Sequence, residues 1–238
     1  MTTIDNNIQQ VLSRIAQACA AAGREPAGVS LLAVSKTFGP DAVAEAAAAG
    51  QRAFGENYIQ EGVEKVAALR QLSPASLQWH CIGPIQSNKT RLVAEHFDWV
   101  HTVDRLKIAE RLSAQRPEHL APLQVCIQVN VDGADTKSGV PPEEALALAV
   151  AVAKLPRLTV RGLMSIPDHA PDFEAQKELH LRAQRLFAQI KASGVSGLAS
   201  FDTLSMGMTA DLEAAIHAGS TLVRVGTGIF GGRVHPTA

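Results

Sequence analysis

Residues 29–34 read Val-Ser-Leu-Leu-Ala-Val and lead through Ser35-Lys36-Thr37 into the alanine-rich stretch Asp41–Ala49. A short, almost continuously apolar run is typical of a strand that is buried on both faces. The alanine-rich stretch that follows consists of strong helix formers. The same order of strand and helix recurs along the chain, which predicts parallel strands joined by right-handed crossover helices.

Eight such runs are expected as strands: Val29–Val34, Arg52–Phe54, Trp79–Ile82, Trp99–Thr102, Leu123–Val129, Val160–Ile166, Phe201–Ser205 and Leu222–Val225. Seven helices are expected among them: Asp41–Ala49, Gln60–Leu69, Lys89–His96, Arg105–Ala114, Pro142–Lys154, Asp172–Lys191 and Ala210–His217. Eight parallel strands can close into a barrel filled by side chains. The predicted fold is therefore α/β, a single (β/α)₈ TIM barrel domain over residues 1–238. An open doubly wound sheet is the alternative, but the glycine-rich dinucleotide turn is absent after the first strand.

The last crossover is incomplete, because only Ile229–Ala238 follow the eighth strand. These residues are too few for a full closing helix. The segment Ile4–Ala21 has apolar residues at helical spacing on one face. We expect it to form an N-terminal helix that packs on the barrel and covers the gap.

Composition restricts the classes of function. The 238 residues are 46% hydrophobic and 19% charged with a net charge of −1, and no long basic run predicts contact with nucleic acid. The three cysteines, Cys19, Cys81 and Cys126, are widely spaced, which favours a reducing cytoplasm. The N-terminus does not resemble a signal peptide, and no apolar run is long enough to span a bilayer. We expect a soluble, cytoplasmic monomer without a membrane contact.

Lys36 is the first candidate for chemistry, because ligands of such barrels bind at the C-terminal ends of the strands. It follows the first strand and has the same parity as Leu32 and Val34, which would aim it to their side. Partial desolvation there disfavours the ammonium form and frees the amine to attack a carbonyl. The alternative is a surface lysine that begins a loop, and position alone does not decide between the two.

Two glycine-containing loops follow the seventh and eighth strands, Ser205–Thr209 and Arg224–Gly228. This is where the fold commonly holds phosphate, because glycines let the backbone approach an anion. The alternative is helix capping, with Thr209 as N-cap and with Asp211 and Glu213 complementing the helix dipole. Together with Lys36, the loops predict a phosphate-bearing aldehyde bound as a Schiff base.

Arg224 indicates which aldehyde. Its guanidinium stays protonated, so it would donate a hydrogen bond to a pyridine nitrogen and keep that nitrogen unprotonated. The cofactor expected is pyridoxal 5′-phosphate (PLP). An ion pair across the barrel rim is the alternative role for Arg224.

Other polar residues near strand ends have weaker patterns. Asn57 is expected to contact the cofactor or to hold Lys36, unless it is only a turn residue. His80 is a further candidate contact, although such a histidine is more often part of a core. A cluster after the sixth strand lacks a recognised ligand spacing, so no metal is expected there. Its members are Asp168, His169, Asp172 and Glu174.

At this point the chain resembles the pyridoxal phosphate homeostasis protein family, whose barrel is related to the N-terminal domain of alanine racemase. The stretches that carry the resemblance are Ala33–Thr37, Phe54–Tyr58, Trp79-His80 with Ile82-Gly83, Gln86–Lys89, Gly162–Met164, Leu204–Met208, and Val223–Thr227 with Ile229–Gly231. Phe38, Cys81 and Thr209 depart from the usual pattern. The resemblance implies that Lys36 carries the Schiff base and that Arg224 faces the ring nitrogen. It also implies that Ser205, Gly207, Gly226 and Thr227 hold the phosphate, and we add Met208 of the same loop to the expected contacts.

The function that the resemblance implies is a non-catalytic PLP carrier in intracellular PLP (vitamin B6) and amino-acid homeostasis. Its partners would be PLP and, transiently, PLP-dependent apoenzymes. An amino-acid racemase and a class I aldolase are the alternatives. Racemisation needs an acid–base group on each face of the substrate. The one tyrosine is Tyr58, and the chain ends soon after the eighth strand without the β domain that supplies a tyrosine in racemases. Arg224 suits a pyridine better than a sugar, so we expect no catalytic residues.

Overall fold

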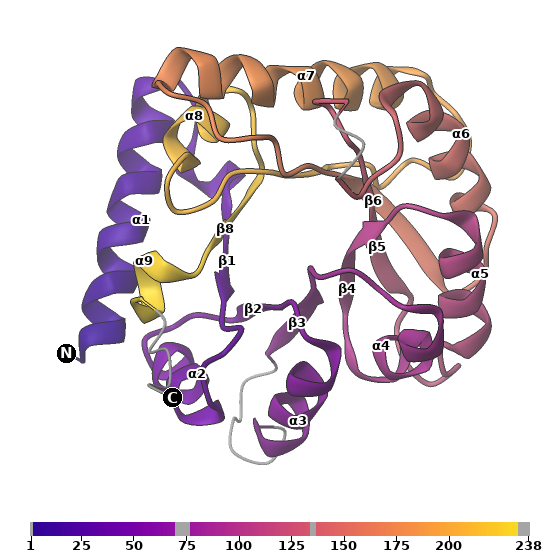
Figure 1. Ribbon diagram of the computed structural model, residues 1–238, viewed down its shortest axis with the longest axis horizontal. Helices are drawn as coiled ribbons and strands as arrows, with labels where there is room; N and C mark the ends of the chain where they lie inside the picture. Colours follow the sequence, from indigo (N-terminus) through magenta and orange to yellow (C-terminus); the bar gives the residue numbers. More distant parts are fainter. Residues whose placement is uncertain (1, 70–76, 134–136, 233–238) are drawn as a thin grey trace.

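The computed structural model describes residues 2–69, 77–133 and 137–232. In it the strands form one closed parallel barrel in which each strand pairs with the next and β8 pairs with β1 (Figure 1). The strands are β1 (Ser30–Val34), β2 (Ala53–Glu56), β3 (Gln78–Cys81), β4 (Trp99–Val103), β5 (Leu123–Gln128), β6 (Leu158–Met164), β7 (Thr203–Ser205) and β8 (Leu222–Val225). The predicted (β/α)₈ barrel is confirmed.

Helices surround the barrel in the order of the chain (Figure 1). They are α1 (Thr3–Ala21), α2 (Pro40–Ala48), α3 (Ile59–Leu69), α4 (Thr90–His96), α5 (Leu106–Gln115), α6 (Pro142–Ala153), α7 (Phe173–Ala192), α8 (Leu212–His217) and α9 (Thr227–Phe230). Each predicted helix and strand is present, with ends that differ by two residues or fewer. The sequence analysis missed α9, a single turn directly after β8.

Helix α1 closes the ring of helices, as predicted. It lies beside α2, α8 and α9, and Figure 1 shows it as the indigo helix along that side of the barrel. Ile8, Val11 and Ile15 are buried on its inner face. Arg14 forms an ion pair with Glu213 of α8 at 2.7 Å, and the Asn7 side-chain amide donates to the Ile229 carbonyl of α9 at 2.8 Å. The first helix therefore supports the segment that follows the last strand.

Alternate residues of each strand face opposite sides of the barrel wall. In β1, Leu31 and Ala33 belong to the large core between the strands and the helices. Leu32 and Val34 belong to a separate apolar cluster with Ile82 and Leu222, inside the barrel. Leu32 and Val34 therefore share one face of β1, as expected, whereas the direction of the Lys36 side chain stays a prediction.

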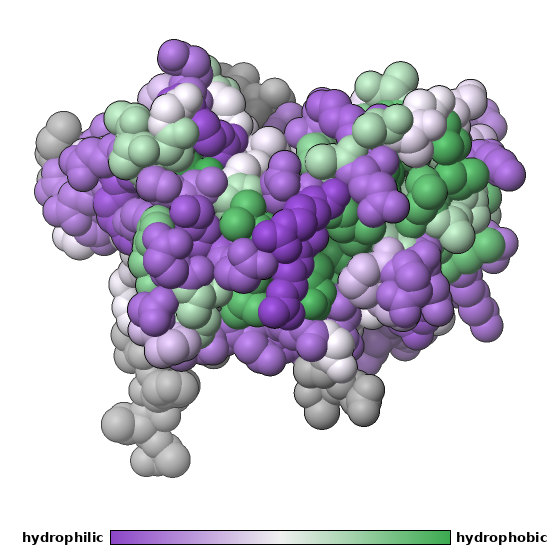
Figure 2. Space-filling model, turned by 90° about the horizontal axis from the view of Figure 1, so that it is seen from above, coloured by the Kyte–Doolittle hydropathy of each residue, from purple (hydrophilic) through white to green (hydrophobic). Residues whose placement is uncertain are grey.

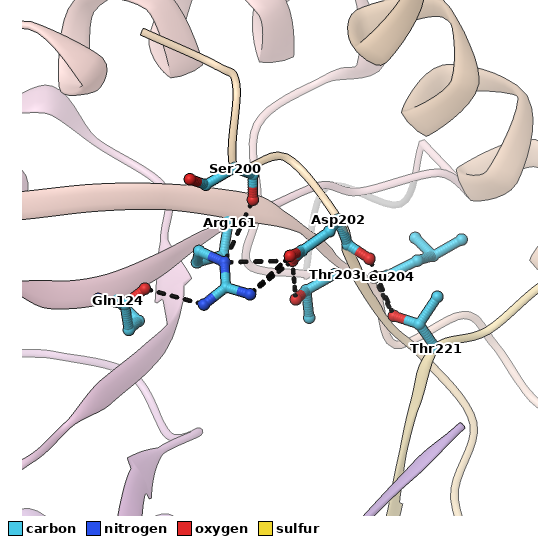
Figure 3. Close-up of polar contacts among 7 residues, drawn as sticks. All are labelled: Gln124, Arg161, Ser200, Asp202, Thr203, Leu204 and Thr221. Atoms are coloured by element: carbon cyan, nitrogen blue, oxygen red, sulfur yellow. Dashed lines mark hydrogen bonds and ion pairs between the residues drawn. The ribbon is translucent and has the colours of Figure 1, made fainter. Parts of the chain in front are cut away.

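A polar network joins β5, β6 and β7 near the N-terminal end of the barrel (Figure 3). Arg161 of β6 donates to both carboxylate oxygens of Asp202 at 2.7–2.8 Å and to the Gln124 side-chain oxygen at 3.0 Å. Its guanidinium also lies 4.8 Å from the centre of the Trp99 ring, which lies inside the barrel. This cation–π contact and the bidentate pair fill the end opposite to the expected site.

The outer surface seen from the side of α7 and α8 carries many hydrophilic residues, and hydrophobic residues gather toward the right of the view (Figure 2). Within the described part of the chain, no helix combines the length and apolar character needed to cross a bilayer.

We expect Gly162→Ala to destabilise the barrel strongly. Gly162 of β6 pairs with Thr203 of β7, and a Cβ atom at residue 162 would lie 1.7 Å from the Thr203 carbonyl oxygen. Backbone must move to admit it, so the free energy of unfolding in urea should fall by about 1–3 kcal/mol. Gly28→Ala is the matched control, because no atom in the described part of the chain lies within 4 Å of its added carbon. That variant should stay within about 0.5 kcal/mol of the parent, and equal stability of the two variants would contradict the prediction.

Candidate functional site

Arg224 is a buried cation inside the barrel. It lies on β8 opposite Leu32 of β1, and 4% of it is exposed. Its guanidinium donates to the Ser205 hydroxyl at 2.8 Å and to the Ser165 carbonyl at 3.0 Å. Burial lowers its pKa to about 10, so it remains charged at neutral pH. A buried charge is stable only with hydrogen-bond partners, which here come from the ends of β6 and β7.

Two buried histidines extend this contact across the barrel. His101 Nδ1 lies 2.9 Å from the Ser205 hydroxyl, and His101 Nε2 lies 2.9 Å from His80 Nδ1. The His80 ring stacks on Trp99 with ring centres 5.2 Å apart and planes 8° apart. Burial lowers the pKa of His80 to about 3 and that of His101 well below its usual value. Both rings are therefore neutral at physiological pH.

The hydrogen positions in this chain follow from Arg224. Because Arg224 donates to the Ser205 oxygen, the Ser205 hydroxyl is free to donate to His101 Nδ1. His101 then carries its proton on Nε2 and donates to His80 Nδ1, which leaves His80 Nε2–H without a partner among the described residues. If these hydrogen bonds ran in the opposite direction, the Ser205 hydroxyl hydrogen would also lack an acceptor among the described residues. The chain therefore runs from Ser205 toward His80.

Lys36 lies in the turn that follows β1 and is partly exposed. Ser35 before it is fully buried, and its hydroxyl donates to the buried carboxylate of Glu56 at 2.5 Å. Thr37 after it has a φ of 70°, in the left-handed region. The structure thus brings Lys36 to the C-terminal end of the barrel between two residues with constrained positions.

The two glycine loops lie side by side at the same end. Gly207 has a φ of 92°, and its carbonyl accepts a hydrogen bond from the Arg224 amide at 2.9 Å. A Cβ atom at Gly226 would lie 3.2 Å from the Val34 carbonyl oxygen, two residues before Lys36. The Thr227 hydroxyl lies 3.3 Å from that of Thr209 and joins the loops. In both loops, a ligand group can therefore come close to the backbone next to the end of β1.

The capping role weighed for Thr209 is wrong in its detail. Helix α8 begins at Leu212, and Asp211 occupies the cap position. The Asp211 carboxylate accepts from the Met208 amide at 2.6 Å and lies 2.9 Å from His180 Nε2. The sequence alone does not identify the N-cap residue here, because several polar residues of this loop could precede the helix. Met208 itself is exposed on the rim.

Asn57 directly follows β2, the strand that pairs with β1. Its side-chain oxygen is buried without a partner among the described residues. It borders a cavity of about 230 Å³ at the ends of β2 to β6. The cavity is also lined by Ile82, Thr102, Gln128 and Ile166.

The acidic cluster after β6 has other contacts. Asp168 pairs with Lys137 at 2.7 Å, and Asp172 caps α7 by accepting from the Ala175 amide. Glu174 lies 3.7 Å from Lys177 on the same helix. Within the described residues, no group of three or more potential ligands is arranged to hold a metal ion.

The sequence analysis missed His101 and Ser165. Both are fully buried, and both complete the polar chain around Arg224. Strand alternation could not place His101, because Val100 and Val103 both lie in the outer core although they are three positions apart, with a register shift between them. Ser165 contributes through its carbonyl oxygen, which no side-chain pattern could indicate.

Comparison with known proteins agrees with this geometry. Residues 4–234 match the family model described as alanine racemase, N-terminal domain. A pyridoxal phosphate homeostasis protein of Vibrio cholerae is 53% identical over 234 residues, covering 98% of each chain. The structure of PipY of Synechococcus elongatus with PLP bound is similar, with a TM-score of 0.78 and 37% identity over 91% of this chain and 100% of PipY.

An alanine racemase of Corynebacterium glutamicum shares the fold. It has a TM-score of 0.66 and 18% identity over 97% of this chain and 61% of the racemase. The motifs, the closed barrel and the full-length relatives thus lead to one assignment. The chain belongs to the alanine racemase N-terminal domain family and, within it, to the pyridoxal phosphate homeostasis proteins.

Proposed function

We propose that this chain, as one barrel domain over residues 1–238, holds PLP at its mouth without acting as an enzyme. The observation that carries the proposal is the buried, charged guanidinium of Arg224, held by Ser205 and Ser165 beneath the ends of β1, β7 and β8. A fixed donor that cannot give up its proton suits the acceptor nitrogen of a pyridine ring. The PLP bound to PipY supports the same cofactor here.

The two glycine loops fit a phosphate group. Gly207 and Gly226 lack the side-chain atoms that would crowd Ala215 and Val34. The first amides of α9 have no partner within that helix and lie where the loop of β8 turns away from β1. We assign the Thr227 hydroxyl to the phosphate side as well. The Ser205 hydroxyl is engaged with Arg224 and His101, and the Met208 amide with Asp211, so these two residues shape the loop rather than donate to the phosphate.

Lys36 is the residue that we assign to covalent binding. When bound, PLP supplies an aldehyde that an amine can convert to a Schiff base. Lys36 lies next to the Gly226 loop across the β1–β8 pair, so it can reach a group whose phosphate rests on that loop. Asn57, with its unpartnered buried oxygen, is placed to accept a hydrogen bond from the ring side. We assign His80 an indirect role, because it is linked to Ser205 through hydrogen bonds with His101.

The racemase hypothesis is less well supported by the geometry. A second acid–base group would need a pKa near the working pH, so that it can both take up and give up a proton. The histidines nearest to Arg224 are neutral, because burial lowers the pKa of both. An unprotonated pyridine nitrogen beside Arg224 would also weaken the cofactor as an electron sink. The fold shared with alanine racemase does not by itself supply the chemistry.

These features favour storage and exchange of a reactive aldehyde in PLP and amino-acid homeostasis. Free amines of amino acids and of PLP-dependent apoenzymes would be the exchange partners. The three cysteines are free and buried, which supports a reducing compartment such as the cytoplasm. We propose that the carrier acts there as a monomer.

Borohydride reduction of the PLP-loaded protein should attach a pyridoxyl group to Lys36. Reduction makes a Schiff base permanent, so peptide mass spectrometry then identifies the lysine. Lys36→Ala should lose the adduct and the visible absorption of the bound cofactor. An adduct found mainly on Lys89 or Lys137 would refute the assignment.

Replacing Gly226 by valine should weaken PLP binding by about tenfold or more and pyridoxal binding by about twofold or less. The added atoms would meet the Val34 backbone and push the loop away from the phosphate, which pyridoxal lacks. Equilibrium dialysis with both ligands measures the difference. Gly232→Ala is the control, since its added carbon meets no atom of the described residues within 4 Å. Equal losses for both ligands would show that the loop does not recognise phosphate.

The loaded protein should exchange the α-proton of amino acids slowly. Without a second positioned acid or base, the rate of α-proton exchange should be about 10²–10⁴-fold lower than in an enzyme that has one. Proton NMR in deuterated water, with a panel of L-amino acids, measures the rate. Exchange at about 1 s⁻¹ or faster, abolished in Lys36→Ala, would restore the enzyme hypothesis.

A further inference from the structure

The turn that carries Lys36 has a strained backbone. The Phe38 amide donates to the Ser35 carbonyl at 3.1 Å, so residues 35–38 form a β-turn with Lys36 in its second position. Thr37, in the third position, has a φ of 70°. A turn with a left-handed third residue normally uses glycine or asparagine there, and a β-branched residue is a clear outlier. Something outside the turn must hold it in this form.

A buried ammonium group holds one end of the turn. Lys65 of α3 is 3% exposed, and its Nζ donates to the Ser35 carbonyl at 2.7 Å. It also donates to Oε1 of Glu56 at 2.9 Å and to Oε1 of Glu61 at 2.6 Å. Three acceptors match the three hydrogens of the ammonium group. Lys65 is thereby fixed against the residue that precedes Lys36.

Glu61 holds the other end. Its Oε1 accepts a hydrogen bond from the Thr37 amide at 2.6 Å, the residue with the strained backbone. Glu61 lies in the first turn of α3, one helical turn before Lys65, so both side chains share a face of the helix. A carboxylate there interacts favourably with the helix dipole, and its bond to an amide is charge-assisted.

We propose that Glu61 is a positioning residue for Lys36. By holding the Thr37 amide it keeps the turn in the one form that presents Lys36 at the barrel mouth, while Lys65 fixes Ser35. Glycine in place of Thr37 would adopt this conformation without strain, but it would also adopt many others. A strained threonine with an external anchor restricts the turn to one conformation before a ligand arrives. The role of Lys36 rests on the proposed function, whereas the anchoring of the turn does not.

A purely structural role for Glu61 is the competing explanation. In that case Glu61 would serve only to neutralise Lys65, and its loss would affect the whole site equally. The two explanations differ in what they predict for the Thr37 amide and for ligands without an aldehyde. Glu61 is 29% exposed, so a shortened side chain there should still allow the protein to fold.

The first measurement uses the protein without PLP. Glu61→Ala should speed hydrogen exchange of the Thr37 amide, followed by NMR, by about tenfold or more, because the carboxylate acceptor is lost. Glu64→Ala is the matched control, since it removes an exposed carboxylate from the same helix. That control should change the exchange by about twofold or less. An unchanged rate in Glu61→Ala would overturn the anchor.

The second measurement compares PLP with pyridoxine 5′-phosphate, which has the phosphate and ring but no aldehyde. Glu61→Ala should weaken PLP binding about tenfold and pyridoxine 5′-phosphate binding about twofold or less. Glu61→Gln, which keeps an oxygen acceptor, should recover part of the loss. Equal losses for both ligands would establish the purely structural role instead. If the parent protein formed no adduct on Lys36, the proposed function would fail, while the exchange measurement would still decide the anchor.

A double-mutant cycle tests the link between anchor and strain. In the Thr37→Gly background, the effect of Glu61→Ala on PLP binding should shrink from about tenfold to about twofold, because glycine needs no anchor in the left-handed region. Independent effects of the two substitutions would contradict the proposal.

Discussion

The pairing of β8 with β1 is the contact on which the rest of the structure depends. It closes the barrel, and its register sets Arg224 opposite Leu32 and Val225 opposite Ala33. Because successive residues face opposite sides of the wall, this register sends the guanidinium inward and the valine outward into the helix-packed core. A shift by one residue would bury Arg224 among the helices and leave the interior without its cation. The same pairing brings the Gly226 loop beside the end of β1.

The interior of the closed barrel holds both apolar and polar groups. Leu32, Val34, Ile82 and Leu222 fill one side, and the stack of His80, Trp99 and Arg161 extends toward the N-terminal end. Between them, a single hydrogen-bonded chain gives Arg224 its partners without a carboxylate in the chain itself. Neutral histidines serve this purpose well, because they pass a hydrogen bond along without adding charge to a low-dielectric interior.

Much of the fold was predictable, because eight buried strands and their crossovers leave a periodic pattern, and the missing glycine-rich turn favoured a closed barrel over an open sheet. The positions of Lys36, Gly226 and Arg224 at strand ends were predictable for the same reason. The partners of Arg224 were not, since Ser165 acts through its backbone and His101 faces inward only because of the strand register. The turn network of Glu56, Glu61 and Lys65 was missed too, because two helical residues reach back to a loop that precedes them by more than 20 positions. Helix α9 was missed because one turn of helix has too few residues to show a period.

Helix α1 has a consequence for how the protein is made. Its apolar face rests on α8 and α9, and Asn7 bonds to Ile229 across 222 positions of sequence. During synthesis the first helix leaves the ribosome long before its binding surface exists. At about 5–20 residues per second, roughly 10–45 s separate the two events. During that interval Ile8, Val11 and Ile15 lack the surfaces of α8 and α9 on which α1 packs in the folded protein. The barrel is sealed, and its glycine loops gain their support, only when the last strand has been translated.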